Sequence, residues 1–133
     1  MRTVWRITTA RFAQTAFSGE GARLYGGRWN PKGWDVVYTA ESQSLGSLEL
    51  MVQDDPLRAQ YVLIPAQLPD DLRETRISIE QLLDDWRTIG ARDVLQSMGQ
   101  AWLQGAQTAL LSVPSAVVPA ERNILINPRH PDF

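Results

Sequence analysis

Runs of hydrophobic residues along the 133-residue chain predict five β-strands. Each run is short, rich in β-branched, aromatic or aliphatic residues, and none reaches the roughly 18 apolar residues of a membrane span. The runs are VWRITT (4–9), DVVYTA (35–40), YVLIPAQLP (61–69), TALLSV (108–113) and NILIN (123–127). The pattern indicates a domain built around a sheet.

A helical period of apolar residues is clearest over residues 91–105, where Gly105 supplies a stop. Ser78 and Gln81 have the spacing of a capping box, which predicts a short helix after them. Because strands and helices follow one another in both orders, we expect a compact α+β single domain. The apolar positions of the 91–105 helix are Ala91, Val94, Leu95, Met98, Ala101 and Trp102.

Residues 42–52 predict another helix and place a carboxylate where a core residue is expected. Leu45, Leu48 and Val52 share one stripe, and a serine is available as the N-cap. Glu49 falls on the same stripe, where a carboxylate without a partner is costly. Either Glu49 points inward as a functional acid, or the stripe is narrower and Glu49 lies on its solvated shoulder.

Residues 13–32 are rich in glycine and predict a long functional loop or an irregular hairpin. The NPKG segment at 30–33 fits a β-turn. Just before it, Arg28 follows two glycines. Glycine lets the backbone approach a ligand closely, and a guanidinium matches phosphate or carboxylate. Arg28 therefore marks either an anion site or a solvated hairpin tip.

Three more side chains are candidates for ligand contacts. Tyr38, near the end of the second predicted strand, and Tyr25, in the glycine-rich loop, could pack in the core or stack on a flat heterocycle. Ser115 lies in the stiff segment VPSAVVP, where its hydroxyl either serves a site or satisfies its own turn. His130 has no obvious orienting acid, so a serine-hydrolase triad is not indicated.

Composition excludes several kinds of site. The chain has no cysteine, and the single histidine, His130, cannot form a multi-histidine metal site. A net charge of -2 and a pI near 5.3 argue against broad binding to nucleic acids or anionic membranes. Arg2, Arg6 and Arg11 could mimic a transit peptide, but the strand pattern there is the stronger signal. We expect a cytoplasmic protein.

Three blocks of the sequence together resemble the RES domain family. They are GARLYGGRWNPKGWDVVYTAES, then SLELMV, then LLSVPSAVVPAERNILINPRHPDF. The resemblance covers nearly the whole chain, so we expect one RES domain over residues 1–133, similar to the ParT-type members. This family supplies the toxins of RES–Xre toxin–antitoxin pairs and is named for an arginine, a glutamate and a serine. Its fold resembles that of ADP-ribosyltransferases.

Matched to the family motifs, the arginine is Arg28, the glutamate is Glu49 and the serine is Ser115, with Ser112 as the alternative. Tyr38 falls at a family active-site position. The resemblance implies an enzyme that consumes NAD as its substrate and needs no metal. It would transfer ADP-ribose to a protein such as phosphoribosyl pyrophosphate synthetase, or degrade NAD by hydrolysis or phosphorolysis. Ser115 is expected to donate a hydrogen bond to the nicotinamide or ribose.

With NAD as substrate, Arg28 is expected to hold the pyrophosphate, with Gly27 and Tyr25 beside it. Tyr38 would cover the nicotinamide or ribose. Glu49 would stabilise the ribosyl cation, which resembles the oxocarbenium ion of glycoside hydrolysis. The glycines do not give the G-x-G-x-x-G spacing between a strand and a helix, so a redox role for NAD is not indicated.

The expected partners are a cognate Xre-type antitoxin and a protein acceptor of ADP-ribose, with no membrane and no direct nucleic-acid binding. Family members usually continue beyond the last block, whereas this sequence ends at Phe133, so we expect a trimmed C-terminus that affects the antitoxin surface. An inactive interaction module is a second class, against which the intact Arg28, Glu49 and Ser115 argue. An RNA-cleaving toxin is a third, disfavoured by the acidic pI and single histidine.

Overall fold

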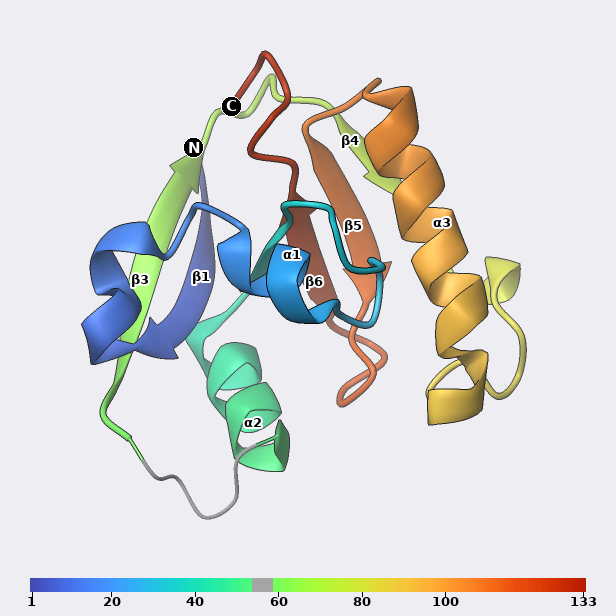
Figure 1. The fold of residues 1–133 in the computed structure, drawn as a ribbon, viewed down its shortest axis with the longest axis horizontal. Coiled ribbons are helices and arrows are strands. Elements are labelled where there is room, and N and C mark those ends of the chain that lie inside the picture. The colour runs from blue at the N-terminus through green and yellow to red at the C-terminus, as the bar shows by residue number, and fades with distance from the viewer. Residues whose placement is uncertain (54–58) are drawn as a thin grey trace.

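The computed structural model describes residues 1–53 and 59–133, which form strands and helices in the mixed order of an α+β domain (Figure 1). The strands are β1 (Arg2–Thr9), β2 (Val37–Ala40), β3 (Tyr61–Leu68), β4 (Glu74–Arg76), β5 (Leu110–Pro114) and β6 (Arg122–Ile126). The α-helices are α1 (Glu20–Tyr25), α2 (Gln43–Gln53) and α3 (Arg92–Gly105). Short 3₁₀ helices span Ala10–Thr15, Ile79–Gln81 and Ile89–Ala91. The expected fold class is confirmed.

The strands join one sheet in the order β3-β1-β2-β6-β5-β4. Neighbours are antiparallel except β4 and β5, which are parallel. The joint between β1 and β2 is the loosest, because these strands share only the pair Trp5 with Ala40, whereas β1 pairs with β3 along its whole length. The two halves of the sheet therefore separate beside this pair, and α1 lies over the space between them in Figure 1.

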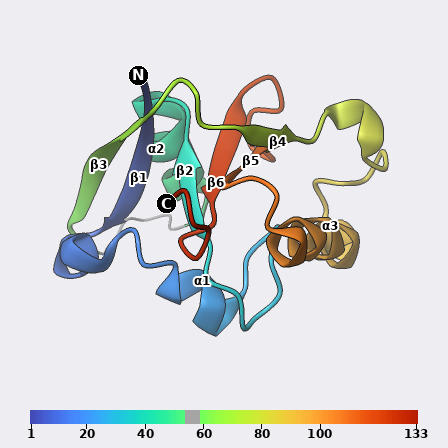
Figure 2. The same ribbon diagram turned by 90° about the horizontal axis from the view of Figure 1, so that it is seen from above.

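Two apolar clusters hold the layers together. On one side of the sheet, Leu95, Trp102 and Leu103 of α3 pack with residues of β5 and β6 and with Trp29. Figure 2 shows α1 and α3 on this same side. The second cluster has members in both halves of the sheet, so apolar packing continues across the loose joint between β1 and β2. Its members are Val4, Val37, Leu68, Leu110, Ile124 and Ile126.

Helix α2 packs across β1 and β2 at a glycine. A Cβ on Gly46 would lie 3.3 Å from the side chain of Ile7 and 3.7 Å from that of Ala40. The predicted serine cap is Ser42, whose Oγ accepts the amide of Leu45 at 3.0 Å. This docking turns the inner face of α2 toward the loose joint of the sheet.

The glycine-rich segment 13–32 is not a loop throughout, because α1 lies within it. The predicted turn in the NPKG segment is present at residues 32–33, and another turn precedes it at residues 28–29. The amide of Gly27 donates to the carbonyl of Asn30, with Arg28 at the tip, while the amide of Gly33 donates to the carbonyl of Arg23. Of the two predictions for residues 13–32, a long loop or an irregular hairpin, the irregular hairpin describes the Gly27–Asn30 turn better.

The predicted helix after residue 78 is a three-residue 3₁₀ helix, although its capping box is present. The apolar stripe of α2 is narrower than predicted, since Leu48 is 41% exposed and Val52 is 64% exposed. In α3, Val94 is exposed and Gly99 is buried instead. Within residues 1–53 and 59–133, no helix has both the length and the apolar character needed to cross a membrane.

Candidate active site

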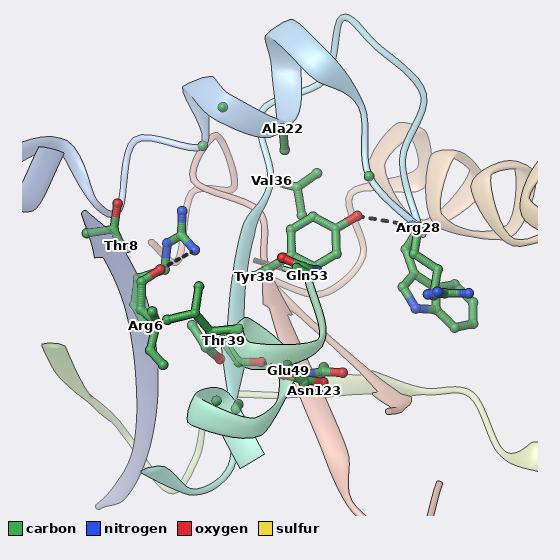
Figure 3. A pocket seen from close by; sticks show the side chains of 18 of the residues that line it. Arg6, Thr8, Ala22, Arg28, Val36, Tyr38, Thr39, Glu49, Gln53 and Asn123 are labelled. Atoms are coloured by element: carbon green, nitrogen blue, oxygen red, sulfur yellow. Dashed lines mark hydrogen bonds between the residues drawn. The ribbon is translucent and has the colours of Figure 1, made fainter. Parts of the chain in front are cut away.

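A cleft of about 740 Å³ opens where β1 and β2 separate. Its walls come from β1, from α1 and the segments on either side of it, from β2 and from the inner face of α2, with Arg92 of α3 and Asn123 of β6 also in the lining. The volume falls in the range of small-molecule and cofactor sites. Figure 3 shows its chemistry: Arg6 and Arg28 lie on either side of the Tyr38 ring, and Glu49 lies beside Asn123 below it.

Glu49 is held by two hydrogen bonds from different parts of the fold. Ser115 Oγ donates to one carboxylate oxygen at 2.8 Å, and Asn123 Nδ2 donates to the other at 2.9 Å. The inward interpretation of Glu49 therefore describes its geometry, although its neighbours Leu48 and Val52 are exposed. Partial burial raises the pKa of Glu49, and the two donors oppose that shift.

The two candidate serines have different surroundings. Ser115 is buried, and besides donating to Glu49 it accepts the amides of Val117 and Val118 at 3.1 and 3.2 Å. Its donor and both acceptor positions are thus occupied. Ser112 instead accepts a bond from Arg122 Nε at 2.7 Å. Neither serine lines the cleft itself, but Ser115 is bonded to Glu49, which does. Ser115 is therefore the serine joined to the site.

Arg28 projects from the tip of its turn and is half-buried. Nη1 donates to the carbonyl of Arg87 at 3.3 Å, a long bond that leaves most of the guanidinium unused. Within residues 1–53 and 59–133, no carboxylate pairs with it. Burial and nearby Arg92 lower its pKa, yet a guanidinium stays charged. A desolvated, unpaired cation favours an anionic ligand.

Two more arginines line the cleft, and the sequence pattern did not indicate either of them as a site residue. Arg6 on β1 donates to the carbonyls of Ala16 and Ile7, and burial lowers its pKa. Arg92 opens α3, and its Nε is buried without a partner among the described residues. Neither forms an ion pair within the described part of the chain. The cleft thus offers three unpaired cations.

Tyr38 uses its hydroxyl inside the protein. It donates to Asn30 Oδ1 at 2.5 Å and accepts the amide of Trp29 at 3.1 Å, and burial raises its pKa. A Cβ on Gly27 would lie 2.6 Å from this hydroxyl, so the glycine is needed for the loop to approach Tyr38. Tyr25 lines the cleft but is 79% exposed. The ring of Tyr38 is one of several aromatic side chains that line the cleft, with Trp5, Phe12 and Trp29.

Besides Arg92 of α3, sequence reasoning missed two site residues on strands, Arg6 and Asn123. Each is a polar residue within a strand of apolar pattern, VWRITT for Arg6 and NILIN for Asn123. That position was the available signal, because polar side chains at inward strand positions require partners. Which of them faces Glu49 depends on strand pairing, which the sequence does not reveal.

Replacing Glu49 with Gln should change how stability depends on pH. In the unfolded chain Glu49 has its ordinary pKa, whereas burial raises the pKa in the fold. Between the two values the folded state binds more protons, so the stability contribution of Glu49 falls as pH rises through this window. In thermal melts from pH 4 to 8, the melting temperature of Glu49→Gln relative to that of the wild type should therefore increase as pH rises. The exposed control Glu80→Gln should track the wild type.

The RES domain profile matches residues 3–133. Three similar proteins are a protein called Toxin Res from Photorhabdus laumondii (36% identity; 98% of this chain, 84% of that protein), another Toxin Res from Yersinia enterocolitica (36%; 98% and 86%), and a Prs ADP-ribosylating toxin from Sphingobium sp. (40%; 96% and 83%). A solved chain of the M. tuberculosis MbcT–MbcA toxin–antitoxin complex aligns with a TM-score of 0.76 and 26% identity, covering 94% of this chain and 73% of that one. The chain belongs to the RES domain family.

Proposed function

We propose that this RES domain is the toxin of a toxin–antitoxin module and that it cleaves the nicotinamide–ribose bond of NAD and transfers ADP-ribose to a protein. The observation that carries the proposal is the position of Glu49. Its carboxylate is fixed by Ser115 and Asn123 in a cleft that also holds unpaired arginines. The 40% identity to a protein named as an ADP-ribosylating toxin supports the transferase reaction.

In the proposed reaction the bond between ribose C1′ and the nicotinamide nitrogen breaks, and nicotinamide leaves with the electron pair. Positive charge develops at C1′, as in glycoside hydrolysis. Glu49 stabilises that charge and binds a ribose hydroxyl, because a carboxylate in a sheltered cleft interacts strongly with a developing cation. The acceptor nucleophile then bonds to C1′ and loses its proton. Ser115 orients Glu49 rather than contacting the substrate, since its hydrogen is already donated.

The cations of the cleft give NAD its orientation. Arg28 holds the pyrophosphate, because its guanidinium is unpaired and can bind two phosphate oxygens at once. Arg6 supplies a second positive charge on the other side of Tyr38 (Figure 3). The Tyr38 ring lies between them as a flat surface for the nicotinamide or ribose. NAD is the substrate, and the chain's own residues supply the chemistry.

We propose an Xre-type antitoxin as the partner in the cytoplasm, because the solved structural relative comes from a toxin–antitoxin complex. The proposed acceptor is phosphoribosyl pyrophosphate synthetase, supported by the name of the Sphingobium relative. Water or phosphate could take the place of the protein nucleophile up to the cation stage. Hydrolysis and phosphorolysis are therefore the alternative outcomes of the experiment that tests the acceptor.

The test uses purified protein with NAD labelled on its adenylate, incubated alone, with phosphate, and with a cell lysate or purified phosphoribosyl pyrophosphate synthetase. Chromatography follows small molecules and gels follow proteins. Label on the synthetase supports the proposal. Free ADP-ribose or its phosphorylated form without a labelled band would replace the transferase with an NAD-degrading enzyme. No product in any arm contradicts the NAD proposal and favours an inactive interaction module.

Exchanging the two candidate serines for alanine should separate their roles. Ser115→Ala removes one of the two donors to Glu49, so we expect kcat to fall about tenfold, or about 1.4 kcal/mol. Ser112→Ala removes an acceptor from Arg122, which should cost about 1 kcal/mol of stability and leave kcat near wild type. Steady-state kinetics and chemical denaturation of both variants check this. Equal losses of kcat would contradict the assignment.

A further inference from the structure

Both peptide groups that flank the Cα of Arg28 are held by side chains from other elements. The carbonyl of Gly27, before Arg28, accepts a hydrogen bond from Gln96 Nε2 of α3 at 2.8 Å. The amide of Trp29, after Arg28, donates to the Tyr38 hydroxyl of β2 at 3.1 Å. Since these two peptide planes set the backbone angles of Arg28, its side chain leaves the turn in a direction fixed by α3 and β2.

Helix α3 can reach this turn because of a glycine on the same face. Gly99 lies three residues after Gln96, so the two share one side of the helix. A Cβ on Gly99 would lie 1.7 Å from the carbonyl oxygen of Trp29, a distance that no side chain tolerates. Gly99 is buried against the turn. Contact at Gly99 and the Gln96 bond thus anchor consecutive parts of the turn to one rigid helix.

The Arg28 side chain has little else to hold it. Its long bond to the carbonyl of Arg87 at 3.3 Å is its one hydrogen bond among the described residues. An arginine has many rotamers, and binding must offset the entropy lost when they are restricted. Fixing the backbone on both sides lowers that loss before a ligand arrives. The turn is therefore preorganised by its neighbours rather than by its own ion pairs.

We propose that Gln96 is a positioning residue, which acts through the Gly27 carbonyl to aim Arg28 at the anionic part of the substrate. The kinetic part of this inference rests on the proposed function, whereas its structural part does not. Gln96 contacts no reacting atom in this scheme. Removing it should weaken substrate binding more than it slows the chemical step.

The test compares Gln96→Ala and Gln96→Glu with the matched exposed control Gln104→Ala on the same helix. Hydrogen exchange without ligand should be faster in residues 26–30 of both Gln96 variants and unchanged in the control. With NAD, Gln96→Ala should raise KM about tenfold and leave kcat within twofold. Gln96→Glu should be at least as severe, because its carboxylate faces the Gly27 carbonyl and cannot donate.

A double-mutant cycle shows whether the effect passes through Arg28. In an Arg28→Ala background, Gln96→Ala should have no further effect on KM. Unchanged exchange in residues 26–30, or KM effects that multiply in the double variant, would overturn the inference. If wild-type protein does not turn over NAD, the proposed function has failed, and the exchange measurement alone then supports or rejects the role of Gln96.

Discussion

Glu49→Gln should lower the turnover of NAD about 10³-fold while changing the affinity for NAD by only a fewfold. The substitution keeps the size of the side chain and removes its charge. A loss of that size is typical when a preorganised electrostatic group is removed from an active site. Single-turnover measurements with labelled NAD give the rate of the chemical step, and calorimetry with the inactive variant gives the affinity.

Two companion variants sharpen this result. Glu49→Asp keeps the charge but shortens the side chain, so its carboxylate cannot reach both Ser115 and Asn123, and turnover should fall here as well. Glu80→Gln makes the same chemical change at an exposed position outside the cleft and should retain wild-type turnover. A Glu49→Gln variant that turns over NAD at the wild-type rate would remove Glu49 from the mechanism.

Elements with continuous apolar runs could be predicted from the sequence, and elements without them could not. The five predicted strands are confirmed. β5 and β6 bury several aliphatic residues, whereas β1 and β3 bury one each, Val4 and Leu68. β4 was missed because its residues, Glu74–Arg76, are polar, and it forms only by pairing with β5. α1 was missed because it starts after Gly19, which has φ 77°, in a segment whose glycines indicate a loop.

The inward position of Glu49 could be predicted from its spacing to Leu45 alone, but not from the whole apolar stripe of α2. Leu45 is 1% exposed, and Glu49, four residues later, faces the same way. The remaining apolar residues of the predicted stripe lie at the surface, so periodicity over the whole helix was misleading. The partners of Glu49 could not be predicted, because they come from segments 66 and 74 residues away in the chain. Its catalytic role stays a prediction.

The family motif favours Ser115, but the surroundings of Ser112 and Ser115 could not be predicted from sequence, because both lie in the same apolar segment. Pairing of β5 with β6 places Ser112 opposite Ile124, within reach of Arg122. Ser115 follows the end of β5, where a turn directs its hydroxyl to Glu49. Two serines only three residues apart thus have different roles: Ser112 supports the fold, and Ser115 supports the site. Only the register of the sheet shows this difference.

Arg28→Ala should weaken the binding of NAD about 30-fold, or about 2 kcal/mol, because charge-assisted hydrogen bonds to the pyrophosphate are lost. We expect kcat to change much less, since Arg28 holds a part of NAD whose charge is the same in the transition state. Titration calorimetry with ADP-ribose, which has the pyrophosphate but no nicotinamide, should show the same loss. Arg73→Ala removes an equal charge outside the cleft and should bind like the wild type.

Nicotinamide riboside distinguishes a phosphate contact from a general loss of the site. It has the scissile bond and no phosphate, so its weak binding should be the same in wild type and Arg28→Ala. If Arg28 instead contacted the nicotinamide end, affinity for the riboside would fall and affinity for ADP-ribose would not. Arg6 lies on the other side of Tyr38 (Figure 3), so Arg6→Ala under the same three ligands shows which arginine binds the pyrophosphate. Loss of ADP-ribose binding in Arg6→Ala alone would transfer that role from Arg28 to Arg6.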